Sequence, residues 1–147
     1  MAKFVYGMQN ILELKVKMED QRKAEYGLAN AKLREEEEKL KQLLIRKAGY
    51  EKRARDLVKG KIDVQKIKTC RHAVDAMKSA IRTQMMEIQV AEKNVELARG
   101  RLNHVMMERK THEKLREKAF EEFKQDVAYE ENREIDQLVS YSYHRGS

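Results

Sequence analysis

A chain of 147 residues, of which 39% are charged, has room for one domain but too few apolar residues for a thick globular core. It contains no proline and no tryptophan and carries a formal net charge of +7, so we expect a mostly helical chain with a narrow apolar stripe. It has no run of about 18 apolar residues, no signal-peptide hydrophobic region and only one cysteine, Cys70, which together favour a cytoplasmic protein.

The first helix is expected over residues 4–58. Its apolar residues predict a coiled-coil seam, the two rows of side chains that face a partner helix. The seam is expected to open on Phe4, Ile11, Leu14, Met18, Gln21 and Leu28. After a register slip of one residue near 29–31, it is expected to continue through Leu33, Leu40, Leu43, Lys47, Tyr50, Ala54 and Leu57. The acidic run at 35–38 is typical of a solvated face with ion pairs along one helix.

A chain reversal is expected at residues 59–63. The register of the first helix, carried forward, would put Lys61 and Lys68 in the core, whereas the next apolar pattern starts at Ile67. Gly60 is a natural helix terminator, and Asp63 is a good N-cap for the following helix. The alternative is one continuous helix that dimerises in parallel, and the break in phase argues against it.

The second helix, expected over residues 64–139, carries the strongest pattern in the chain. Two rows of residues repeat every seven positions, so this helix must pack along another helix. The first row is Ile67, Val74, Ile81, Ile88, Val95 and Leu102, and the second is Cys70, Met77, Gln84, Ala91, Ala98 and Val105. The β-branched residues of the first row indicate packing, because they are poor choices for helix propensity alone.

Together these elements predict an all-α fold, a single-domain, long antiparallel two-helix coiled coil (a helical hairpin) whose second helix overhangs the first. Opposed residue numbers should sum to about 124, so Phe4 is expected to face Phe120. The overhang is about 20 residues, or about 30 Å at about 1.5 Å per residue. Its apolar residues Phe123, Val127, Ile135 and Leu138 would have no partner within the chain. A frayed tail is expected at 140–147.

Charge is distributed unevenly along the sequence. Residues 41–82 contain 13 Lys or Arg against 4 Asp or Glu, a net charge of +9, whereas residues 119–147 contain 3 against 7, a net charge of −4. This asymmetry is compatible with solubility alone or with different partners at the two ends. Nucleic acid is not expected at the basic end, because Tyr50 is its only aromatic residue and no base-reading motif is present.

Catalytic, cofactor-binding and metal-binding residues are not predicted. The four histidines include no pair at i,i+4 spacing, and a single cysteine does not complete a zinc site. No glycine-rich phosphate loop is present, and two paired helices offer no walls for a pocket. The sequence therefore favours an interaction protein over an enzyme.

Two stretches of the sequence resemble the FliJ family, a small component of the bacterial flagellar protein-export apparatus. One is FVYGMQNILELK at residues 4–15, and the other is ERKTHEKLREK at residues 108–118. The resemblance implies an antiparallel two-helix coiled coil, similar to the stalk of the ATP synthase γ subunit. It also implies three kinds of partner: the ring of the export ATPase FliI, the membrane export-gate protein FlhA, and export chaperones.

The resemblance also suggests where the partners bind. The ATPase ring is expected to receive the end that bears both termini, through Phe4, Met8, Phe123, Val127, Ile135 and Leu138. The export gate is expected to contact the second helix just past the reversal, at Ala73, Met77, Ala80 and Gln84. A FliJ-like protein would be cytoplasmic and peripheral at the inner face of the cell membrane, at the flagellar base.

Two alternatives stay open at this point. One is the equivalent stalk of a virulence-type secretion system, of the YscO type, which shares the architecture. The other is a basic coiled-coil rod that binds nucleic acid or an anionic membrane. The salt dependence of binding distinguishes such a rod from an ATPase stalk, because binding to a polyanion weakens steeply as the salt concentration rises.

Overall fold

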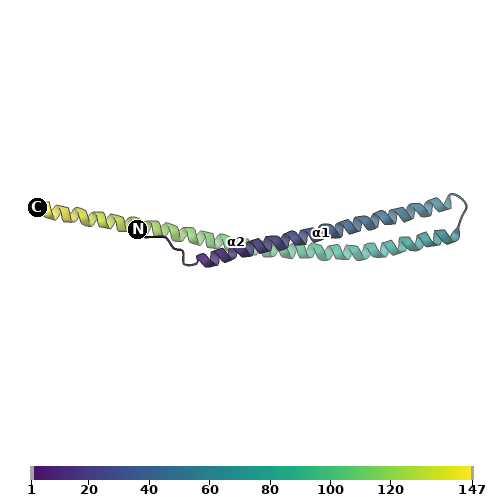
Figure 1. Ribbon diagram of the computed structural model, residues 1–147, viewed down its shortest axis with the longest axis horizontal. Coiled ribbons are helices and arrows are strands. Elements are labelled where there is room, and N and C mark those ends of the chain that lie inside the picture. The colour runs from purple at the N-terminus through teal and green to yellow at the C-terminus, as the bar shows by residue number, and fades with distance from the viewer. Residues whose placement is uncertain (1, 147) are drawn as a thin grey trace. The chain divides into compact units, whose positions relative to one another are not determined.

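Two long helices make up almost all of the computed structural model, which describes residues 2–146. Helix α1 spans Gln9–Val58 and helix α2 spans Val64–Gly146 (Figure 1). Within the described residues no strand is formed. The predicted fold class, an all-α helical hairpin, is confirmed.

Contacts divide the chain into two compact units. The turn unit is Arg22–Leu102, and the termini unit combines the chain up to Gln21 with the chain from Asn103 onward. The sequence predicted a single hairpin domain. Two units arise because a side chain in a two-helix pairing contacts only residues that lie nearby along the same seam.

The core of the turn unit is the seam that the heptad pattern predicts. On α2, Cys70, Ala91, Val95 and Ala98 are buried, and the other seam residues from Ile67 to Leu102 are half-buried. On α1, the half-buried residues include the predicted seam positions Leu33, Leu40, Leu43, Lys47, Tyr50, Ala54 and Leu57. Small and β-branched side chains here allow the two helices to approach closely.

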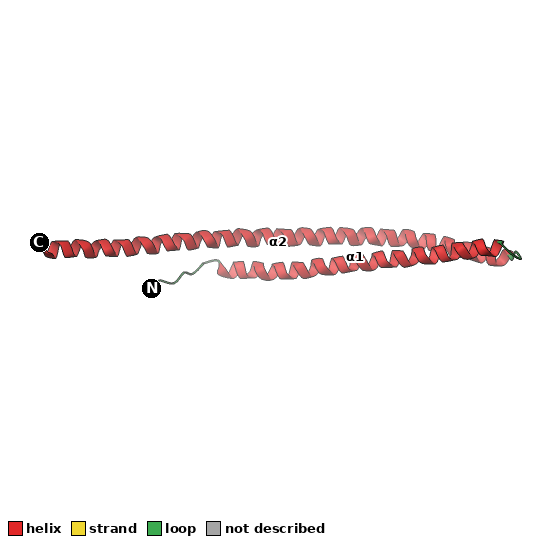
Figure 2. Cartoon of the chain, turned by 90° about the horizontal axis from the view of Figure 1, so that it is seen from above, coloured by secondary structure: helices red, strands yellow, loops and turns green. Residues whose placement is uncertain are grey.

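The connection between the helices occupies residues 59–63 (Figure 2). Asp63 caps α2, since its Oδ1 accepts hydrogen bonds from the backbone N–H groups of Gln65 at 3.0 Å and Lys66 at 3.3 Å. Gly60 lies in this connection but not in a left-handed conformation, because no glycine among the described residues has a positive φ. The end of α1 instead tightens through a hydrogen bond from the Lys59 N–H to the Asp56 carbonyl at 3.2 Å.

Two helix bounds in the termini unit differ from the prediction. Helix α1 begins at Gln9 rather than near residue 4, because a turn at residues 7–8 precedes it and the Gln9 N–H donates to the Tyr6 carbonyl at 3.1 Å. Helix α2 passes the predicted end at 139 and continues through the stretch expected to fray, as far as Gly146. Residues 101–145 contain neither glycine nor proline, so nothing in that stretch breaks the helix.

The predicted opening of the first seam is wrong at most of its positions, although Phe4 and Met18 are half-buried. Ile11 and Leu14, in the termini unit, and Leu28, in the turn unit, are exposed. The buried residues of early α1 are Leu12 and Glu19, with Lys15 half-buried between them. Every seventh residue before Leu33, back to Leu12, is buried or half-buried. The same holds for every seventh residue before Leu43, back to Lys15. The seam therefore runs without the expected register slip.

Val95 and Val90 provide a matched test of the seam. Val95 is 9% exposed and Val90, five residues earlier on α2, is 56% exposed. Val95→Ala should lower the free energy of unfolding by about 1–3 kcal/mol, because it leaves a cavity in the seam. Val90→Ala should change it by less than about 0.5 kcal/mol. Urea denaturation followed by circular dichroism measures both, and equal losses would contradict the assignment of the seam.

Candidate interaction surfaces

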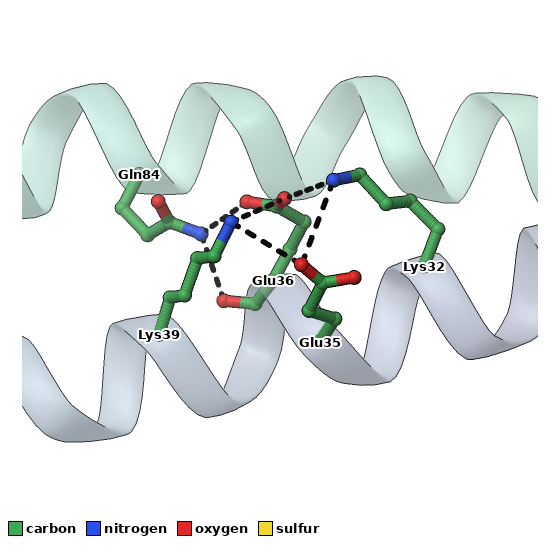
Figure 3. A network of polar contacts seen from close by, with 5 residues as sticks. All are labelled: Lys32, Glu35, Glu36, Lys39 and Gln84. Carbon is green, nitrogen blue, oxygen red and sulfur yellow. Dashed lines mark hydrogen bonds and ion pairs between the residues drawn. The ribbon is translucent and has the colours of Figure 1, made fainter.

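A buried carboxylate lies on the seam of the turn unit. Glu36 is 5% exposed and accepts two hydrogen bonds from α2: Gln84 Nε2 donates to its Oε2 at 2.6 Å and to its backbone carbonyl at 2.8 Å. Lys32 Nζ lies 2.9 Å from Glu36 Oε1, and Lys39 Nζ lies 3.3 Å from the same atom. Figure 3 shows this network closing around the carboxylate between the two helices.

The network keeps Glu36 charged. The hydrogen bond from Lys32, followed by that from Gln84, lowers the pKa of Glu36 from 4.5 to about 2, although burial opposes the shift. The same pairing raises the pKa of Lys32. The acidic run at 35–38 was predicted to be a solvated face, and for Glu36 that prediction is wrong. Glu36 falls on a seam position, seven residues before Leu43.

The four residues expected to contact the export gate lie along this part of α2. Ala73, Met77, Ala80 and Gln84 are all half-buried. Met77 and Gln84 belong to the seam itself, and the Gln84 amide is already engaged by Glu36. Ala73 and Ala80 lie beside the seam. The structure thus brings the four onto one side of α2, the side that faces α1.

A second charged seam position lies in the termini unit. Glu19 is buried, and Arg109 of α2 donates to it through Nε, while Arg109 Nη1 donates to Glu113 Oε1 at 2.7 Å. Glu113 and then Glu19 raise the pKa of Arg109. Nearby, Lys15 Nζ lies 2.6 Å from Glu108 Oε2 and lowers the pKa of that carboxyl. The two helices of this unit are therefore joined by charge pairs as well as by apolar contacts.

Three phenylalanines hold the first residues of the chain against α2. The ring centroid of Phe4 lies 5.0 Å from that of Phe120 and 5.5 Å from that of Phe123. The Arg116 guanidinium carbon lies 5.8 Å from the Phe4 centroid, and Lys124 Nζ lies 4.9 Å from the Phe120 centroid. The expected Phe4–Phe120 contact is confirmed. Phe123 was predicted to have no partner within the chain, and that prediction is wrong because Phe4 precedes α1 and covers it.

The end of α2 continues past the start of α1 as a single exposed helix (Figure 1). Val127 is half-buried, and every residue from 128 to 146 is exposed. We call residues 128–146 the overhang. Its large exposed hydrophobic side chains are Tyr129, Ile135, Leu138, Val139, Tyr141 and Tyr143. Four carboxylates against two arginines give the overhang a net charge of −2. It therefore combines aliphatic and phenolic side chains with acidic ones.

Among residues 2–146, no group of three or more His, Cys, Asp or Glu side chains is arranged to hold a metal ion. Neither helix, over its described length, contains a stretch apolar enough to cross a membrane.

Comparison with known proteins identifies the family of this chain. The family model described as "Flagellar FliJ protein" matches residues 5–147, which include both helices. The chain belongs to the FliJ family. A search of curated proteins and a search of solved structures found no match. Family membership assigns the protein an export-related role in the bacterial flagellum, as the resemblance at residues 4–15 and 108–118 implied, and FliJ proteins are non-enzymatic components of that apparatus.

Sequence reasoning missed the charged seam positions of this FliJ protein. A carboxylate at a core position resembles a solvated residue unless its partner on the other helix is known. A signal was nevertheless present. Counting by sevens from Leu33 leads back to Glu19, and counting by sevens from Leu102 leads forward to Arg109, which has the opposite charge.

The pKa of Glu36 predicts a specific loss of stability in acid. Above pH 4.5 the carboxylate is charged in both the folded and the unfolded chain, so its full stabilising effect is present. As the pH falls from 4.5 to about 2, the unfolded chain binds a proton that the folded chain does not, and this stabilisation is lost. Glu36→Gln should therefore be less stable than the native chain at pH 7, and the difference should shrink through this window.

Urea midpoints measured at neutral and acidic pH test this prediction, with Glu37→Gln as the control. Glu37 is the next residue on α1 and is exposed. Its variant should keep a nearly constant difference from the native chain. A Glu36→Gln difference that also stays constant would show that Glu36 is not held charged by its neighbours.

Proposed function

We propose that this FliJ-family protein is a non-enzymatic stalk and adaptor of flagellar protein export, which docks its overhang in the ring of the export ATPase FliI. In this role it promotes assembly of the ring and links it to the export-gate protein FlhA and to export chaperones. It would act in the cytoplasm, peripherally at the inner face of the cell membrane at the flagellar base. The observation that carries the proposal is the apolar surface of the overhang.

The overhang supports helix-in-groove docking. Leu138 is the third residue after Ile135, so the two side chains lie on neighbouring turns of one helix face. Burial of each side chain contributes about 1.5–3 kcal/mol, and about 1.4 kcal/mol changes an affinity tenfold. These two residues alone can therefore decide whether a ring binds at physiological concentrations.

The remaining expected ring-contact residues take a supporting role in this proposal. Phe4 and Phe123 pack on each other, so they hold the start of the chain against α2 at the base of the overhang. Val127, four residues after Phe123 on α2, is half-buried, and Met8 is exposed. We assign direct contact to Ile135, Leu138 and Met8, and an anchoring role to Phe4, Phe123 and Val127.

Contact with the export gate remains part of the proposal, with a narrower set of residues. Because Gln84 and Met77 lie on the seam, a gate protein would reach them only through their exposed edges. Ala73 and Ala80 lie at the margin of the seam and leave room for an incoming apolar side chain. We therefore propose Ala73 and Ala80 as the centre of the gate contact.

Replacement of two side chains of the overhang tests the docking. Ile135 and Leu138 are 55% and 66% exposed, and Val90 and Met86 of the turn unit are 56% and 65% exposed. The double variant Ile135→Ser, Leu138→Ser should melt as the native chain does, because neither residue is buried. It should require at least about tenfold more protein to stimulate ATP hydrolysis by the ring, given about 1.4 kcal/mol per tenfold.

The matched control is Val90→Ser, Met86→Ser, which removes similar exposed apolar surface from another part of α2. This control should stimulate the ATPase as the native chain does. Full stimulation by the Ile135→Ser, Leu138→Ser variant would show that the overhang is not the docking segment.

A second pair of variants tests the gate contact. Ala80→Asp should weaken binding to the cytoplasmic part of FlhA, because it places a carboxylate where an apolar contact is proposed. Gln84→Ala should lower the melting temperature, because it removes a hydrogen-bond donor from the buried Glu36 carboxylate. Binding by pull-down and melting by circular dichroism separate the two effects. Undiminished binding of a folded Ala80→Asp chain would remove Ala80 from the contact.

A further inference from the structure

The connection between α1 and α2 exposes aliphatic side chains among lysines. Val58, Ile62 and Val64 are all exposed, although each is a large apolar residue. Four exposed lysines surround them: Lys59, Lys61, Lys66 and Lys68. We call residues 58–68 the tip. Exposed aliphatic residues this close together are not explained by the hairpin itself, since the seam ends at Leu57 and resumes at Ile67.

The tip is also the most basic part of the turn unit. Residues 52–71 contain eight Lys or Arg against two Asp. Of those two aspartates, Asp63 is used as the cap of α2. Within residues 2–146, none of the four tip lysines forms an ion pair with a carboxylate. The ion pair between Lys47 and Glu51 lies earlier on α1, outside the tip. The positive charge of the tip is therefore available to a partner.

We propose that the tip is a docking site for the surface of an anionic lipid bilayer. Lysines near a bilayer are attracted by the acidic headgroups, and their long side chains allow the ammonium groups to remain in the headgroup layer. Val58, Ile62 and Val64 would enter the boundary between headgroups and acyl chains. Insertion stops at this depth, because the backbone groups of the connection at 59–63 need water or headgroups as hydrogen-bond partners.

The side chains of the tip favour a bilayer over other polyanions. Proteins that bind single-stranded nucleic acid combine positive charge with aromatic platforms, and residues 52–71 contain no aromatic side chain. Three exposed aliphatic residues would add nothing to binding a phosphate backbone, whereas each contributes to insertion into a bilayer. This inference goes beyond the proposed ATPase docking, and its test contains neither the ATPase nor the export gate.

Sedimentation with vesicles measures the proposed binding. The full chain should sediment with vesicles made of equal parts phosphatidylcholine and phosphatidylglycerol, and remain in solution with phosphatidylcholine alone. Lys59→Gln and Lys61→Gln should each lower the partition coefficient about fivefold. Ile62→Ser should lower it about tenfold or more. All three residues are exposed, so the variants should keep the native melting temperature.

Matched controls replace similar residues away from the tip. Leu97→Ser removes an exposed aliphatic side chain from the same unit, and Lys110→Gln with Lys114→Gln removes exposed lysines from the termini unit. Each control should leave partition within about twofold of the native chain, because it leaves the tip intact. Equal losses in the Leu97→Ser and Ile62→Ser variants would overturn the proposal.

Insertion can be observed directly, because the chain contains no tryptophan. Ile62→Trp introduces a single reporter at the tip, and Leu97→Trp introduces one on the outer face of α2. With anionic vesicles, the emission of the first should shift to shorter wavelength and be quenched by brominated lipids, while the second should not change. An unshifted Ile62→Trp emission on vesicle-bound protein would overturn the proposal. Binding to a DNA duplex as tight as to vesicles, with no loss in Ile62→Ser, would do the same.

Discussion

Carboxylates buried on the seam of α1 are the constraint on which the pairing of the helices depends. A charged group removed from water is tolerated only if it is paired and hydrogen-bonded. Glu19 pairs with Arg109 of α2, whereas Glu36 pairs with Lys32 and Lys39 of its own helix and accepts hydrogen bonds from Gln84 of α2. A seam of repeated Val, Ile and Ala could slide by one heptad and still be apolar. A slide of seven residues would separate Glu36 from Gln84 and Glu19 from Arg109. We infer that these polar positions set the register within each unit, as single polar residues do in other coiled coils.

The same constraint explains why the apolar residues of α1 are divided between two faces. Because Lys15, Glu19 and Arg22 occupy seam positions at the start of α1, only Leu12 of the aliphatic residues of that stretch is buried there. Ile11 and Leu14 are exposed as a result, although their spacing alone is that of a seam. A two-helix pairing covers only a narrow stripe of each helix, so the remaining apolar side chains are available to partners.

The two units differ in the surfaces they offer. In the turn unit, the exposed aliphatic residues of the tip lie among unpaired lysines. In the termini unit, the exposed aliphatic and tyrosine side chains of the overhang lie among carboxylates. Opposite charge around a similar apolar surface selects different partners, because like charges repel and opposite charges steer encounter. This contrast agrees with an export component that contacts more than one partner.

The fold class and the main seam of α2 could be predicted from the sequence. A heptad pattern unbroken from Ile67 to Leu102 leaves no other way to bury its two rows than against another helix. The change of phase between residues 58 and 67 indicated a reversal, and the Phe4–Phe120 contact followed from antiparallel pairing. The segments at residues 4–15 and 108–118 carried the resemblance to FliJ, which the family match confirms.

The buried face of early α1 and the packing of the first residues could not be predicted from the sequence, because both depend on contacts between the two helices. Local periodicity records where apolar residues recur, but it does not show whether a charged residue has a partner on the other helix. Glu19 and Glu36 are buried because Arg109 and Gln84 lie opposite them, and that relation joins residues 90 and 48 positions apart. The contact between Phe4 and Phe123 likewise depends on the turn that precedes α1. Such a turn leaves no periodic signal in the sequence.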